Sequence, residues 1–152
     1  MVRVTSSSPF ETEEIGRRLG RLLKAGDIVC LFGDLGAGKT TMVKGIASSF
    51  GISSRDVTSA SFTVIAGYPV TPPFYHIDLY RIESPDDLES TGIWDIIGGE
   101  SVSVIEWAER LGDEKLVQSV RVYFEEPAED IRVITIEGIN EENWSDMQAR
   151  QA

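Results

Sequence analysis

The chain contains the stretch Gly33-Asp34-Leu35-Gly36-Ala37-Gly38-Lys39-Thr40. This stretch matches the phosphate-binding pattern G-x-x-x-x-G-K-[ST] at every fixed position. The apolar run Ile28–Phe32 precedes it and is typical of a buried parallel strand. Apolar residues at helical spacing follow it, and the helix that they predict ends at Gly51: Val43, Ile46, Ala47 and Phe50. A strand, a glycine-rich turn and a helix in this order predict a binding site for a nucleoside triphosphate.

In such a turn, backbone N–H groups and the positive end of the following helix face the phosphate chain. We expect Lys39 to reach the β- and γ-phosphates and the Thr40 hydroxyl to bind Mg²⁺. A purely structural turn is the alternative, but strand, loop and helix all agree with the phosphate-binding interpretation. The sequence has no Asn-Lys-x-Asp stretch of the kind that recognises guanine, which favours ATP over GTP.

Composition limits the classes of function. The 152 residues suffice for one domain and are too few for two. The net charge is −11, from 25 acidic against 14 basic residues, and the sequence has no basic cluster, so we do not expect independent binding of nucleic acid. No apolar run is long enough to span a membrane and no signal-peptide pattern is present, so we expect a cytoplasmic protein. The single cysteine, Cys30, lies in the apolar run and is predicted to be a small buried hydrophobe.

The remaining patterns predict an α/β fold of the three-layer P-loop NTPase type, with a parallel core sheet extended by antiparallel strands. Further strands are expected at residues 2–5, 62–69, 74–80, 102–105, 120–124 and 131–136. The last two should pair antiparallel across residues 125–130. Helices are expected after Ser8, with Thr12 as a rival cap, and after Ser84. Residues 1–138 are predicted to form one ATPase domain, and residues 139–152 a polar tail that forms a loose helix.

A phosphate loop also needs an acidic residue at the end of a neighbouring buried strand, where it holds Mg²⁺ or orients the attacking water. Asp78 and Glu106 are the two candidates, because each follows an apolar run. We favour Glu106 as the carboxylate on the metal side, since the run at residues 102–105 is the more apolar. For both residues, the alternative is a solvated acid at a strand end.

Other residues have two interpretations each. Thr58, Ser59 and Ser61 lie in the loop before a predicted strand, where switch segments of nucleotide hydrolases sense the γ-phosphate, although hydroxyl residues are common in any loop. Trp107 shields the phosphate site from water or fills the core. His76 is interpreted as a structural histidine rather than a general base.

An arginine that stabilises the transition state is hard to find in this chain. Between the phosphate loop and Asp78, only Arg55 offers a mobile arginine. Hydrolases of this class without such a residue turn over at roughly 10⁻⁴ to 10⁻³ s⁻¹, and a supplied arginine adds about 10³–10⁵-fold. We therefore expect slow hydrolysis of ATP by the isolated protein.

Four motifs follow one another along the chain: GDLGAGKTT at residues 33–41, VTSASFT at 57–63, HIDLYR at 76–81 and IEWAE at 105–109. Together they resemble the TsaE (YjeE) family, small bacterial ATPases of tRNA threonylcarbamoyladenosine (t6A) synthesis. The resemblance covers about residues 10–138. The first motif alone would indicate only a P-loop NTPase, whereas four in this order are specific to the family.

The resemblance implies a cytoplasmic, Mg²⁺-dependent ATPase that binds the TsaD–TsaB pair, which forms t6A at position 37 of tRNA. Contact with tRNA would then be indirect, through the complex, and the partner pair would activate hydrolysis. By motif, Lys39, Thr40 and Thr41 belong to the phosphate site, while Asp78 and Glu106 are the strand-end acids. Glu106 is the favoured Mg²⁺ partner.

The same resemblance places Trp107 at a switch on the nucleotide side. The chain departs from the family in one motif, with Ser59-Ala60-Ser61-Phe62 where Ser-Pro-Thr-Phe is usual. Loss of the proline removes a fixed φ, which predicts a more mobile switch. Residues 10–12 are the candidate for holding the adenine.

Two other classes of function remain as alternatives. A small-molecule kinase also uses a phosphate loop, but this chain is short and has no insertion that could form a lid. A nucleotide-gated binding module would use ATP to fix a conformation, and hydrolysis would be incidental.

Overall fold

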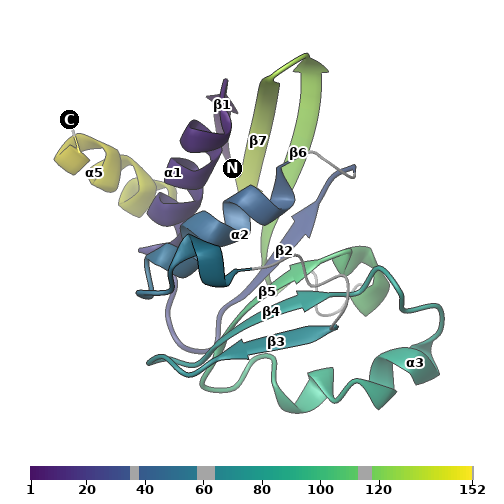
Figure 1. The fold of residues 1–152 in the computed structure, drawn as a ribbon. Helices are drawn as coiled ribbons and strands as arrows, with labels where there is room; N and C mark the ends of the chain where they lie inside the picture. The colour runs from purple at the N-terminus through teal and green to yellow at the C-terminus, as the bar shows by residue number, and fades with distance from the viewer. Residues whose placement is uncertain (35–37, 58–63, 113–117, 152) are drawn as a thin grey trace.

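The computed structural model describes residues 1–34, 38–57, 64–112 and 118–151. Within these residues, seven strands form one sheet in the order β1-β7-β6-β2-β5-β4-β3 (Figure 1). The strands are β1 (Val2–Ser6), β2 (Ile28–Phe32), β3 (Ile65–Tyr68), β4 (Phe74–Asp78), β5 (Val102–Glu106), β6 (Val120–Ala128) and β7 (Ile131–Glu137). The central strands β6, β2, β5 and β4 run parallel, while β3 and β7 run antiparallel to their neighbours. A parallel core extended by antiparallel strands is therefore confirmed.

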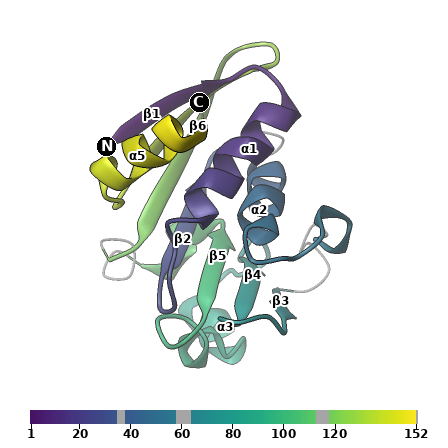
Figure 2. The same ribbon diagram turned by 90° about the vertical axis from the view of Figure 1, so that its left-hand side faces the viewer.

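Helices cover both faces of this sheet. They are α1 (Pro9–Gly20), α2 (Lys39–Ser48), α3 (Pro85–Ser90) and α5 (Glu141–Gln151), with short 3-10 helices η1 (Ser54–Asp56), η2 (Ile93–Asp95) and η3 (Ala108–Leu111). Helices α1 and α2 lie side by side on one face, whereas α3 packs with η2 and η3 on the other (Figures 1 and 2). This arrangement confirms the three-layer architecture. None of the helices in the described part of the chain is both long and apolar enough to cross a membrane.

Capping explains where α1 and α3 begin. The Ser8 hydroxyl accepts a hydrogen bond from the Glu11 amide at 3.1 Å, and Ser84 caps α3 in the same way. Ser8 is thus the cap of α1. Thr12, the rival, is buried and shares a hydrogen bond with the Ser6 hydroxyl at 2.7 Å.

Two glycines let α1 and α2 touch backbone to backbone. A Cβ atom on Gly45 would lie 2.0 Å from the carbonyl oxygen of Glu13, and one on Gly16 would lie 2.4 Å from that of Met42. Real Cβ atoms do not come so close to backbone oxygens, so a larger residue at either position would force the helices apart. This contact brings the start of α1 next to α2, the helix that follows the phosphate loop.

Several predicted boundaries were wrong. The helix expected to reach Gly51 ends at Ser48. Strand β4 stops at Asp78 rather than residue 80. The Asp78 carboxylate accepts a hydrogen bond from the backbone N–H of Tyr80, and the chain turns there. Strand β6 continues to Ala128, beyond the predicted end at residue 124, with a register shift in its pairing to β7 between Glu125 and Ala128.

The predicted strand at residues 62–69 is β3, which begins at Ile65. Residues 62 and 63 lie outside the described residues. Beyond residue 138 the chain forms α5, and its Trp144 is 4% exposed. The Arg18 guanidinium of α1 lies 3.7 Å from the Trp144 ring centroid, which ties this helix to α1. The division of the chain at residue 138 stays a prediction.

Candidate functional site

The glycine-rich loop predicted to bind phosphate, called the phosphate loop below, connects β2 to α2. Residues 35–37, which include Leu35, Gly36 and Ala37, lie outside the described residues, but both ends of the loop are described. Gly38 is the residue before α2 and has a φ of +100°, a left-handed conformation that L side chains rarely adopt. Gly38 also has no side chain that could cap the helix. The N–H groups of the first turn of α2 therefore point toward a site where an anion would be stabilised.

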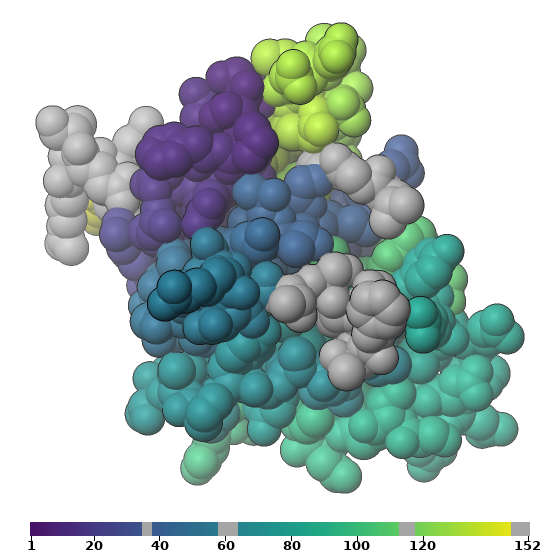
Figure 3. All heavy atoms as spheres, in the orientation of Figure 1, coloured from purple at the N-terminus to yellow at the C-terminus, as the bar shows by residue number. Residues whose placement is uncertain are grey.

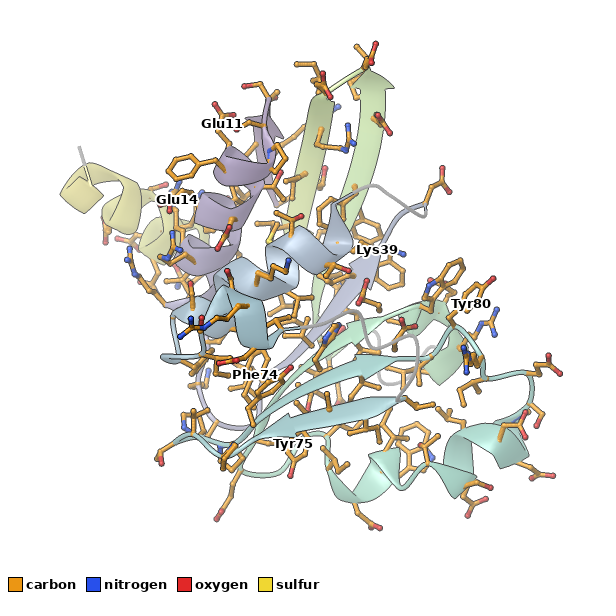
Figure 4. The ribbon with its side chains drawn as sticks, in the orientation of Figure 1. Glu11, Glu14, Lys39, Phe74, Tyr75 and Tyr80 are labelled. Carbon is orange, nitrogen blue, oxygen red and sulfur yellow. The ribbon has the colours of Figure 1, made fainter. Side chains whose placement is uncertain are left out.

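Lys39 lies at the first position of α2 and is only 6% exposed. Its Nζ atom is 4.6 Å from the centroid of the Trp107 ring. Figure 4 labels Lys39 on α2. The Tyr80 ring packs against the same tryptophan, with 5.1 Å between the two ring centroids. Trp107 follows β5 directly and has a φ of +59°, which is rare outside glycine. The structure thus brings the lysine of the first motif together with the tryptophan of the last one.

The two candidate carboxylates are neighbours. Strands β4 and β5 are parallel, and Asp78 is opposite Glu106 at their carboxyl ends. Paired residues of parallel strands point to the same face of the sheet. Val104 precedes Glu106 by two residues and packs in the core cluster that contains α2 residues, so this face is the one that α2 covers. Glu106 is buried, with 5% exposure, while Asp78 is half-buried.

Sequence reasoning missed a contact of His76. This residue is fully buried, and its Nε2 atom lies 2.6 Å from Oε2 of Glu106. Among the described residues, His76 Nδ1 has no hydrogen-bond partner. The strand period of two could have indicated the contact, because His76 and Asp78 must share a face of β4. The predicted structural histidine is in direct contact with the carboxylate favoured as the Mg²⁺ partner.

The available donors suit Mg²⁺. Thr40, Asp78 and Glu106 offer hydroxyl and carboxylate oxygens, which are the ligands that this ion prefers. Within the described residues, no group of three or more His, Cys, Asp or Glu side chains could hold a metal ion. Mg²⁺ in nucleotide sites uses one or two carboxylates together with phosphate oxygens and water. Two neighbouring carboxylates beside a phosphate loop fit that pattern.

A cavity of about 420 Å³ adjoins the phosphate loop at Gly38 and Thr41. Its other walls come from the start of α1 and from the β6–β7 hairpin: Ser7, Ser8, Pro9, Thr12, Asp130 and Arg132. In Figure 3 the purple N-terminal residues lie beside the yellow-green hairpin, above the blue of α2. Of the segment 10–12 suggested for the adenine, Thr12 lines this cavity, whereas Phe10 is 71% exposed.

A larger cavity, of about 740 Å³, lies at the start of α3 and includes Ile82, Leu88, Trp94 and Arg110 in its walls. None of the predicted site residues is among its described lining residues. Size alone therefore does not locate the site, and the smaller cavity beside the loop is the better candidate. Thr58, Ser59 and Ser61, the predicted switch residues, lie outside the described residues, so their role stays a prediction.

Comparison with known proteins bears directly on these motifs. The family model described as "Threonylcarbamoyl adenosine biosynthesis protein TsaE" matches residues 6–134. The chain belongs to the TsaE family. The matched residues include the phosphate loop, both strand-end carboxylates, His76 and Trp107.

Individual TsaE relatives agree with this assignment. A protein of Treponema pallidum named tRNA threonylcarbamoyladenosine biosynthesis protein TsaE is 38% identical over 135 residues, which are 89% of this chain and 99% of the relative. A Bacillus subtilis protein of the same name is 36% identical over 133 residues, covering 87% of this chain and 82% of the relative. The crystal structure of B. subtilis YdiB superimposes with a TM-score of 0.77 at 30% identity, covering 99% of this chain and 96% of that one.

Proposed function

We propose that this protein is a Mg²⁺-dependent ATPase that acts in the cytoplasm and supports t6A formation in tRNA by binding homologues of the TsaD–TsaB pair. Membership of the TsaE family supports the role in t6A biosynthesis. The observation that carries the proposed chemistry is the side-by-side placement of Asp78 and Glu106 at the strand ends, with Lys39 against Trp107, the next residue after Glu106. Contact with tRNA is then made only through the complex.

The residues divide the work of hydrolysis among them. Backbone amides of the loop at residues 33–41 and the Lys39 ammonium would bind the triphosphate, and Thr40 and Glu106 would hold the metal. Mg²⁺, when bound, neutralises charge on the phosphate oxygens and orients them. Asp78 would orient a water molecule, whose oxygen bonds to the γ-phosphorus while the bond from phosphorus to the bridging oxygen breaks. ADP leaves with that oxygen, and the water gives up its proton, so the products are ADP, inorganic phosphate and a proton.

The base and ribose of the nucleotide occupy the cavity beside Gly38 and Thr41. That cavity continues from the loop and has polar walls on both sides, including Ser8 and Arg132. Because α1 supplies one of these walls, nucleotide binding depends on the tight contact between α1 and α2.

We expect slow hydrolysis in the isolated protein. Arg110 lies near Trp107, with its Cζ atom 5.7 Å from the ring centroid, but its guanidinium donates to the carbonyl oxygens of Tyr80 and Ile82. It is therefore occupied in holding the chain after β4. An activating arginine supplied by a partner protein would raise the rate by about 10³–10⁵-fold, as in other hydrolases of this class.

The test is release of inorganic phosphate from ATP, with and without a purified TsaD–TsaB pair from the same organism. The pair should raise the rate at least several-fold, and Glu106→Gln should abolish the increase. Glu100→Gln is the matched control, since Glu100 is exposed and precedes the other end of β5. A rate that stays constant over a wide range of partner concentrations would contradict partner activation.

Phosphate release, read together with phosphorylation of an acceptor and with t6A formation, separates the other classes of function. A kinase would release little phosphate until its acceptor was added, and the acceptor would appear phosphorylated. If the protein were a nucleotide-gated binding module, the Glu106→Gln variant would support t6A formation as well as the natural protein does. This comparison requires that the variant still binds ATP and the partner pair.

A further inference from the structure

We propose that His76 is a positioning residue, which holds the Glu106 carboxylate in the orientation that the metal and phosphate site requires. The proposal rests on the proposed function, because it concerns how the same site is built. His76 itself would touch neither nucleotide nor metal.

Geometry is the first support. His76 and Glu106 come from neighbouring strands, and the His76 Nε2 atom lies 2.6 Å from Glu106 Oε2. His76 is two residues before Asp78, which is opposite Glu106, so all three side chains emerge from the same face of the sheet. The imidazole thus lies two residues behind the carboxylate in the strand register, away from the carboxyl ends of the strands.

Burial is the second support. His76 has no exposed surface, and the Glu106 side chain is 7% exposed. A buried carboxylate is costly unless it accepts hydrogen bonds, so Glu106 needs a donor within the protein. The proposal takes His76 Nε2–H as that donor, 2.6 Å from Glu106 Oε2. Nδ1 has no partner among the described residues, so the contact with Glu106 is the hydrogen bond through which the ring is held.

The bond also divides the two carboxylate oxygens between two tasks. Oε2 forms the hydrogen bond with His76, which would leave Oε1 for the metal or for one of its waters. Carboxylates that bind metals are commonly oriented by a second hydrogen bond of this kind. A carboxylate without that bond could rotate about its last torsion, since such terminal torsions have broad energy wells.

Two substitutions of His76 separate positioning from packing. His76→Gln keeps an N–H donor near the place of Nε2, while His76→Leu fills similar space without a donor. Tyr75→Leu is the matched control, because Tyr75 lies on the same strand and faces the opposite side. The measurement is the affinity for ADP by calorimetry, with Mg²⁺ and with excess EDTA, and the ratio of the two affinities is the readout.

His76→Leu should reduce the Mg²⁺-dependent gain in affinity by about 10-fold or more, and His76→Gln by less than about 3-fold, as expected for loss and partial retention of a supporting hydrogen bond. Affinity in EDTA should not change, and Tyr75→Leu should behave as the natural protein. If His76→Leu keeps the full Mg²⁺-dependent gain, the proposal is wrong. A natural protein that binds no ADP would instead refute the proposed function.

A second measurement does not depend on the fold of His76→Leu. The chain has one histidine, so in tag-free protein the ring ¹⁵N resonances belong to His76 alone. They should show that Nε2 carries a proton, and the ¹H resonance of that proton should be strongly deshielded. In Glu106→Gln this proton should be less deshielded, and addition of Mg²⁺–ADP to the natural protein should shift its resonance. Ring resonances that respond to neither Glu106→Gln nor Mg²⁺–ADP would overturn the proposal, even if His76→Leu did not fold.

Discussion

The two faces of strands β4 and β5 differ in kind, although they are made of alternating residues of the same strands. On the face toward α3, Ile77 and Ile105 are fully buried in an apolar cluster. On the face toward α2, the side chains of His76 and Glu106 are also buried, but they form a polar pair. Side chains of one strand thus contribute apolar burial on one face and chemistry on the other.

The polar face is not polar along its whole length. Phe74 and Val104, which lie farther from the carboxyl ends of the strands than Asp78 and Glu106, belong to the apolar cluster beneath α1 and α2. Ionisable groups begin only in the last positions of each strand, next to the phosphate loop. We infer that apolar burial fixes the strands in register, and that this register places Asp78 beside Glu106.

The largest expected effect is on the apolar face. Ile77→Ala removes a fully buried side chain and should lower the free energy of unfolding by about 2–5 kcal/mol, measured by urea denaturation. Below its unfolding transition, the variant should bind Mg²⁺–ADP like the natural protein. His76→Leu changes the neighbouring residue on the other face, and we expect its main effect on Mg²⁺–ADP binding rather than on the free energy of unfolding. If Ile77→Ala weakened nucleotide binding in the folded state, the two faces would not be independent.

The next effect concerns the helices over the polar face. Gly45→Ala would bring a Cβ atom to 2.0 Å from the Glu13 carbonyl oxygen, so α1 must move. We expect a loss of about 1–3 kcal/mol in stability. Nucleotide affinity should also fall, since α1 supplies one wall of the cavity beside Gly38.

Gly99→Ala is the matched control, because a Cβ atom there would meet nothing within 4 Å. This variant should be neutral or gain up to about 1 kcal/mol, from the lower entropy of its unfolded chain. If Gly45→Ala and Gly99→Ala unfolded at the same urea concentration, the close helix contact would not matter for stability.

The sequence predicted the parts of the site that are local. The glycine pattern and the apolar runs around it predicted β2 and α2, and the apolar run before each acid predicted that Asp78 and Glu106 lie at strand ends. The sequence could not show that Asp78 lies opposite Glu106, because the strand order β2-β5-β4 depends on packing between distant segments. The sequence did not predict the residues that line the cavity beside Gly38 for the same reason. The pairing of β1 with β7, two segments far apart in the chain, brings Ser8 near Arg132.

The smallest effect tests the apolar face again. Burial raises the pKa of the Cys30 thiol to about 11, from 9.0, although a hydrogen bond with Ser119 opposes the change. A folded pKa above the unfolded one means that this contribution to stability is complete below pH 9 and is lost as the pH rises toward 11. In the folded protein at pH 8, Cys30 should react with a thiol reagent far more slowly than in urea. Equal rates would show that this face is open to solvent.

The central claim is that the loop before α2 binds a nucleotide phosphate chain with help from Lys39 and the strand-end carboxylates. Calorimetric titration of folded, tag-free protein with ADP and Mg²⁺ tests it most directly. We predict one ADP bound per chain, with at least about 10-fold weaker binding in Lys39→Ala, since charge-assisted hydrogen bonds contribute about 1.5–3 kcal/mol. Absence of binding at millimolar ADP, in protein whose fold is verified by circular dichroism, would contradict the account.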